Sequence, residues 1–206
     1  MATLKGVLTG IYARLLLGGI KKTEKYQTKG IERIVYWVDT DGWMAGQYTP
    51  WGTIILNKNK LRERPDDLEE FTFLHEVGHS QMHLLPRILL IPLLLSSALG
   101  LFSLPFLLIS MLSSALSAPT SQQPYYAMAF LIVSALVVLY YVIVTWIDEG
   151  YAELFVLSKI GAVNYQECHR KAHESSHSGL LKRIRICLTY PHPKLVVWAG
   201  EKLGKT

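Results

Sequence analysis

Residues 88–146 contain no charged side chain, and this stretch constrains the fold more than any other feature. All 16 acidic and all 21 basic residues of the 206-residue chain lie outside it. A soluble core rarely excludes charge over such a length, whereas hydrocarbon does, because an ionised side chain there costs at least about 2.5 kcal/mol. The stretch therefore predicts a segment embedded in a lipid bilayer.

A polar, turn-forming cluster at residues 118–124 divides this stretch into two parts. A helix needs about 20 residues to cross the hydrocarbon, so residues 88–117 suffice for one crossing but not for two. Residues 125–146 supply a second crossing. The sequence thus predicts a two-helix transmembrane hairpin over residues 86–147.

The distribution of basic residues predicts how this hairpin is oriented. Lysines and arginines flank it and are frequent between residues 159 and 185, while the connecting loop has none. By the positive-inside rule, both flanks face the cytoplasm, which predicts a multi-pass protein of the cell membrane with its active site on the cytoplasmic side. The net charge of +5 then fits an anionic leaflet as partner, and no motif indicates a nucleic acid. In that compartment Cys168 and Cys187 are expected to be free thiols.

The remaining residues predict a single α+β metallopeptidase domain of the zincin type, which the hairpin interrupts. Residues 1–30 are expected to form an amphipathic N-terminal helix. Residues 31–85 are expected to form a small antiparallel sheet, with strands at 31–39, 43–48 and 53–57, followed by a helix that begins at Pro65. Residues 148–206 complete the domain with a further helix and a helical, basic C-terminal part.

That helix contains the motif His-Glu-Val-Gly-His at residues 75–79. Side chains four residues apart lie on one face of a helix, so His75 and His79 can bind one metal ion. Glu76 lies one step round the helix, where it can take a proton from a water molecule at the metal. The motif therefore predicts a Zn²⁺ site with Glu76 as the catalytic general base.

The same pattern occurs a second time, as His-Glu-Ser-Ser-His at residues 173–177. Two serines lie within this copy and a glycine follows it, so a solvated helix or loop is expected there. His169, His173 and His177 recur every four residues and can bind adventitious metal, but the first copy is the better metal site.

A catalytic zinc ion needs a third protein ligand besides the two histidines. The sequence Glu-Gly-Tyr-Ala-Glu at residues 149–153 follows the predicted hairpin and offers Glu149 for this role. Glu153, one turn further, can accept a hydrogen bond from a ligating histidine. The alternative is that these carboxylates only cap the membrane span. The two histidines precede the predicted hairpin and Glu149 follows it, so they lie on the same side of the membrane only if the chain crosses an even number of times. The two predicted crossings satisfy this requirement.

With these segments in this order, the chain resembles the HtpX and CAAX prenyl protease family of membrane zinc metallopeptidases, which are gluzincins. The resemblance extends roughly from residue 31 to the C-terminus. It rests on the strands before the first motif, the motif itself, the hairpin and Glu-Gly-Tyr-Ala-Glu, which is similar to the Glu-x-x-Ala-Asp of the family. The N-terminal spans usual in HtpX proteins are absent, so the chain resembles a reduced member.

The resemblance implies roles for further residues. It makes Glu149 the third zinc ligand and Glu153 the carboxylate that supports a ligating histidine. His192, in Tyr-Pro-His-Pro at residues 190–193, becomes a catalytic residue that donates a hydrogen bond to the oxyanion, although a surface turn is an equally good interpretation. The segment Met44, Ala45 and Gly46 lies where the family has an edge strand that binds peptide substrate.

The function expected from the sequence is that of an integral membrane zinc metalloendopeptidase that hydrolyses membrane-associated or misfolded proteins. Two alternatives remain open. One is a catalytically silent membrane protein that binds zinc and has a regulatory role, against which the intact Glu76 argues. The other is a dedicated processing protease, which shares the chemistry and differs only in its substrate.

Overall fold

The computed structural model describes residues 3–41, 44–62, 65–82, 109–110, 112–114, 116–117, 123–174, 186 and 188–205. The chain divides into two compact units, Met1–Met82 with Glu149–Thr206, and His83–Asp148. All of the sheet and all of the candidate site residues belong to the first unit.

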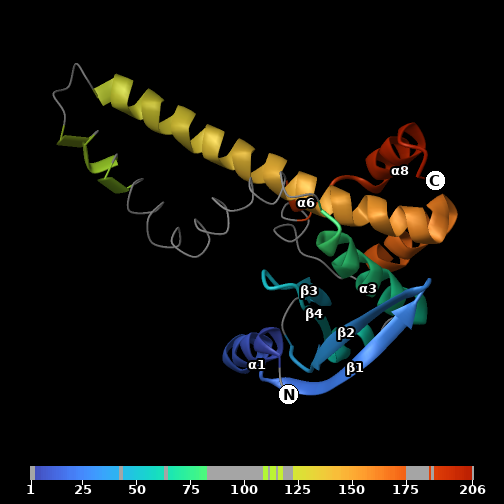
Figure 1. Cartoon of the computed structure of the whole chain (residues 1–206). Coiled ribbons are helices and arrows are strands. Elements are labelled where there is room, and N and C mark those ends of the chain that lie inside the picture. The colour runs from blue at the N-terminus through green and yellow to red at the C-terminus, as the bar shows by residue number, and fades with distance from the viewer. Residues whose placement is uncertain are drawn as a thin grey trace. The chain divides into compact units, whose positions relative to one another are not determined.

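A four-stranded sheet forms the centre of the first unit (Figure 1). Its strands are β1 (Ile20–Thr28), β2 (Ile31–Val38), β3 (Gly46–Tyr48) and β4 (Ile54–Asn57), in the spatial order β1-β2-β4-β3. The three predicted strands are present, but the prediction of an antiparallel sheet is wrong, because β2 and β4 are parallel. After β2 the chain first forms β3 at the far edge and then returns as β4, between β3 and β2, so β4 runs in the direction of β2.

Strand β1 replaces the second half of the expected N-terminal helix. Helix α1 spans Leu4–Leu16 only, and Gly18 and Gly19 follow it with positive φ angles. Strands β1 and β2 then form a hairpin whose two turn residues, Lys29 and Gly30, have φ angles of 49° and 75°. Two positive φ angles are the signature of a type I′ turn, which matches the twist of the paired strands.

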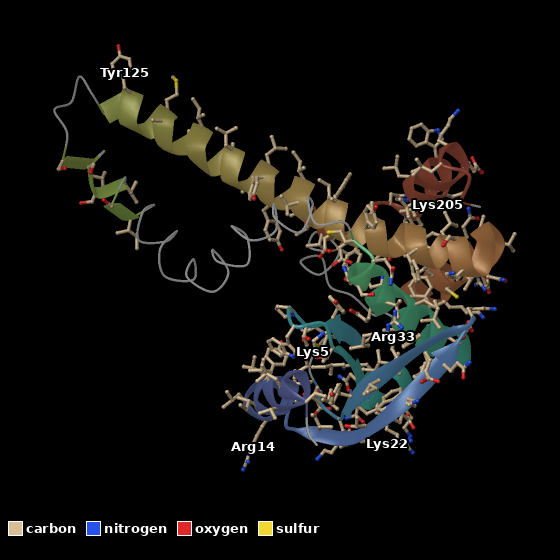
Figure 2. All side chains as sticks on the ribbon, in the orientation of Figure 1. Lys5, Arg14, Lys22, Arg33, Tyr125 and Lys205 are labelled. Carbon is tan, nitrogen blue, oxygen red and sulfur yellow. The ribbon has the colours of Figure 1, made fainter. Side chains whose placement is uncertain are left out.

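The alternation of side chains along β2 and β4 gives the sheet two apolar faces. On one face Val38 and Ile55 pack with Ala13 of α1 and with Leu17, the C-cap of that helix. On the other face the strands pack with helix α3 (Asp66–Ser80) and with the C-terminal helices, through a core that includes Val35, Ile54, Phe73, Leu74, Val156, Leu157 and Val196. Helices α1 and α3 therefore cover opposite faces of the sheet (Figure 1). The polar side chains of Arg14 and Lys22 project outward (Figure 2).

The C-terminal helices add apolar side chains to the core on the side of the sheet that α3 covers. The short helix α2 spans Lys58–Arg62, α6 spans Gln123–Glu174, and α8 spans Pro193–Lys202. Helix α6 is interrupted at Gly161, whose φ of 77° and ψ of 162° are not helical. Residues 162–174 therefore form a separate helical arm, which we call the C-terminal arm of α6.

Among the described residues, no helix is both long and apolar enough to cross a membrane. This finding contradicts the predicted transmembrane hairpin, together with the multi-pass membrane location and the cytoplasmic active site inferred from it. Absence of charge alone does not define a crossing, which also needs a sustained apolar helix. Most of the first expected crossing, residues 88–117, lies outside the described residues.

Candidate metal centre

Helix α3 presents the two histidines of the first motif on one face. Their ring centroids are 4.9 Å apart, and the rings are nearly perpendicular. The side chain of His75 is 10% exposed and that of His79 is 12% exposed. Both imidazoles are therefore mostly withdrawn from water, as expected of ligands in a buried metal site.

Helix α6 brings a carboxylate to these histidines. Oε2 of Glu149 lies 3.0 Å from Nε2 of His75 and 3.9 Å from Nε2 of His79. One ligand atom from each of the three residues lies within 4.8 Å of the other two, the spacing of donors that can share one metal ion. The structure thus brings together the three residues that the sequence predicts as ligands.

Two small residues allow the helices to approach closely enough for this convergence. A Cβ atom added to Gly78 would lie 2.6 Å from Cα and 2.8 Å from the carbonyl oxygen of Ala152. These are backbone atoms, which cannot move aside as a side chain can. Gly78 is therefore required by the packing of α3 against α6, and the same contact brings His75 and His79 within reach of Glu149.

Beneath the three candidate ligands lies a second, more deeply buried carboxylate. Oε1 of Glu153 is 3.2 Å from Nδ1 of His75, although the direction of the His75 N–H departs from hydrogen-bond geometry. Oε2 of Glu153 lies 2.9 Å from Nε2 of His169, on the C-terminal arm of α6. Glu153 thus lies between the imidazoles of His75 and His169. The sequence predicts its contact with a ligating histidine, but not its contact with His169.

The charges in this cluster indicate that the candidate ligands need a positive charge between them. Burial alone would lower the pKa of His75, but its contacts with Glu149 and Glu153 outweigh burial and raise that pKa well above the usual 6.5. Without a cation, a proton must hold the imidazole and the Glu149 carboxylate together at 3.0 Å. A divalent metal ion supplies the same positive charge, so two imidazoles and one carboxylate in this arrangement fit such an ion.

Glu76 lies where the sheet edge meets α3. Its side chain accepts a hydrogen bond from the backbone N–H of Tyr48 in β3. A Cβ atom on Gly46 would lie 2.7 Å from Oε1 of Glu76, so only glycine leaves room for this carboxylate. Burial raises the pKa of Glu76, and the nearby His75 and His79 only partly oppose this effect. A carboxylate with a raised pKa is the stronger base, which suits proton transfer.

The predicted substrate-binding segment leads into β3, which begins at Gly46 and is an edge strand of the described sheet. The carbonyls of Met44 and Ala45 accept hydrogen bonds from Asn57, at 3.1 and 2.8 Å. Since backbone groups alternate along an antiparallel strand, Gly46 turns its own N–H and C=O away from β4. Of the three predicted residues, Gly46 is therefore the one that the geometry orients toward an added strand.

Tyr190 and Pro191 of the Tyr-Pro-His-Pro segment lie near the candidate ligands, whereas His192 is exposed. The Tyr190 ring centroid is 6.3 Å from that of His75, and Pro191 Cγ would lie 3.7 Å from a Cβ atom at Gly150. His192 is the N-cap of α8, where its Nδ1 accepts a hydrogen bond from the backbone N–H of Lys194 at 3.2 Å. An accepting Nδ1 leaves a neutral imidazole with its proton on Nε2, which can therefore donate.

Of the three histidines that recur every four residues between 169 and 177, the structure describes the side chain of His169. The side chains of His173 and His177 lie outside the described part of the chain, so the prediction for them stays a prediction. His169, which the sequence grouped with them, instead contacts Glu153. The contact depends on Gly161, which lies between Glu153 and His169 and has a non-helical conformation that allows the chain to turn back.

No family model, no curated protein and no solved structure matches the chain. The resemblance to gluzincins therefore stays a prediction, based on the motif residues. The roles of the individual side chains rest on the distances and burial described above.

Proposed function

We propose that this chain is a zinc-dependent metallopeptidase of the gluzincin type, with His75, His79 and Glu149 as its metal ligands. The observation that supports this proposal best is the convergence of the three donors from α3 and α6, with the buried Glu76 beside them. Two imidazoles and one carboxylate are a donor set typical of catalytic zinc, whereas calcium and magnesium prefer oxygen donors alone. A zinc ion held by these three residues would supply Lewis-acid chemistry, which would polarise a peptide carbonyl and make water more acidic.

The protein's own side chains then perform the proton transfers and hold the substrate. Glu76 takes a proton from the attacking water and returns it to the nitrogen of the leaving amine. An extended peptide adds to the edge of β3 through the backbone of Gly46, close to Glu76, so that its scissile bond lies over the metal ligands. Nε2–H of His192 donates a hydrogen bond to the carbonyl oxygen as negative charge develops on it. Peptides and unfolded proteins are therefore the proposed substrates.

The decisive variant is Glu76→Gln, which keeps the shape of the side chain and removes the base. We expect the purified variant to bind zinc as the wild type does and to lose peptide cleavage by about 10²- to 10⁴-fold, the contribution of a positioned general base. Cleavage is measured with a fluorogenic peptide library and a denatured protein, and Glu201→Gln, at an exposed position, is the matched control.

Two outcomes contradict the proposal. Cleavage that survives in Glu76→Gln shows that another group acts as the base. A wild-type protein that binds zinc through His75 and His79 but cleaves no peptide is instead a catalytically silent zinc-binding protein.

A further inference from the structure

His169 lies beside the candidate metal centre without belonging to its ligands. Its Nε2 is 2.9 Å from Oε2 of Glu153, and Oε1 of the same carboxylate is 3.2 Å from Nδ1 of His75. The side chain of Glu153 is only 3% exposed, whereas that of His169 is 25% exposed. A continuous line of polar atoms therefore leads from a metal ligand, through a buried carboxylate, to a partly exposed imidazole.

Metal binding determines which ring nitrogen of His75 carries the proton, and so which group faces Glu153. If His75 binds the metal through Nε2, its proton is on Nδ1, next to Oε1 of Glu153. The carboxylate of Glu153 is buried, so its second oxygen needs a hydrogen-bond donor. The Nε2–H of His169 is that donor.

The position of His169 is itself fixed by the fold. Gly161 interrupts α6 and allows the C-terminal arm to turn, and the open space around it shows that its φ of 77°, not crowding, is what requires glycine. On the arm, the His169 ring contacts the rings of Phe71 and Tyr165, with centroids 5.2 and 4.6 Å apart. A hydrogen-bonded ion pair between Lys171 and Asp67 ties the arm to the start of α3.

We propose that His169 is a positioning residue of the metal centre: by donating to Glu153, it holds that carboxylate against His75 and fixes the orientation and the Nδ1–H form of this ligand. The inference deepens the proposed function and rests on its metal site, but not on catalysis. It gives the C-terminal arm a role at the metal centre, because a displaced arm leaves the buried Glu153 carboxylate with one donor fewer.

The test compares two replacements of His169 in the full chain. His169→Gln places an amide N–H near the position of Nε2, whereas His169→Phe keeps a ring but cannot donate. We expect zinc affinity, measured by competition with a chromophoric chelator, to fall about 10- to 100-fold in His169→Phe and to stay within about threefold of wild type in His169→Gln. Gln166→Ala, at an exposed position on the same arm, should leave the affinity unchanged.

A purely structural role predicts a different result. In that case His169→Phe lowers the thermal stability of the metal-free protein, and zinc raises the unfolding temperature of variant and wild type by the same amount. That result, wild-type affinity in His169→Phe, or equal loss of affinity in both variants would overturn the proposal.

The same experiment separates this inference from the proposed function. A wild type that binds zinc but cleaves nothing, with the expected affinities in the two variants, supports the role of His169 and removes the peptidase. A wild type that binds no zinc overturns both.

Discussion

Glycine at position 46 decides whether the proposed base can occupy its place. A methyl group added there would lie 2.7 Å from Oε1 of Glu76 and 2.7 Å from Cγ2 of Thr72, well inside van der Waals distance. Both atoms are at the ends of side chains, so they can move without unfolding the protein. The expected consequence is a displaced Glu76 beside intact metal ligands.

Gly46→Ala should therefore lower kcat by about 10- to 100-fold, since a misplacement of about 1 Å can cost that much. Zinc affinity and the unfolding temperature should stay close to wild type. Steady-state kinetics, with zinc titration alongside, measures both quantities. Unchanged kcat in this variant would show that the close contact of β3 with Glu76 has no part in catalysis.

His192 has two functions in this account, and one substitution separates them. Its Nδ1 caps α8, while Nε2–H is the proposed donor to the substrate carbonyl. Asparagine is among the best N-cap residues, so His192→Asn should keep the helix and remove the imidazole. We expect kcat to fall about 10²- to 10³-fold, as when an oxyanion donor is removed, with the unfolding temperature unchanged.

Tyr190 provides the comparison for this variant, because its ring lies near His75. If His192→Asn retains wild-type kcat while Tyr190→Phe loses activity, the donor is the Tyr190 hydroxyl, and the prediction for His192 is wrong.

The contact between α3 and α6 also depends on a glycine, Gly78, which leaves room for the neighbouring helix. Gly78 meets the backbone of Ala152, so a methyl group at Gly78 must push the two helices apart. Gly78→Ala should lower the free energy of unfolding by about 1–3 kcal/mol, the usual cost of overpacking, and weaken zinc binding because Glu149 moves away from the histidines.

Gly10→Ala is the matched control, because Gly10 is also helical and an added Cβ there meets nothing within 4 Å. Its stability should be unchanged or higher by up to about 1 kcal/mol, the helix preference of alanine over glycine. Chemical denaturation measures both variants. Equal stabilities for Gly78→Ala and Gly10→Ala would contradict the tight contact.

Local patterns in the sequence are sufficient to predict some elements and not others. The helix with His75 and His79 and the strands at β2, β3 and β4 follow from apolar periodicity and turn residues. Strand β1 does not, because its exposed lysines and threonine resemble the polar side of a helix. The parallel pairing of β2 and β4 depends on where β3 is placed, which no local pattern specifies.

The sequence likewise predicts some residues of the metal centre and not others. Spacing on one helix predicts His75, Glu76 and His79, and the carboxylates one turn apart predict Glu149 and Glu153. The role of His169 does not follow from the sequence, because it depends on the reversal at Gly161, a tertiary event. The prediction of a transmembrane hairpin is wrong because it rests on the absence of charge, which does not by itself specify a helix that spans a membrane.

The central claim is that two imidazoles and the Glu149 carboxylate bind one zinc ion. X-ray absorption at the zinc edge tests it most directly, in the zinc-loaded wild type and in Glu149→Ala. We predict scattering from two imidazoles and from oxygen near about 2.0–2.2 Å in the wild type, with the oxygen shell altered in the variant. Identical spectra for the two proteins, or sulfur scattering near about 2.3 Å, would contradict this assignment.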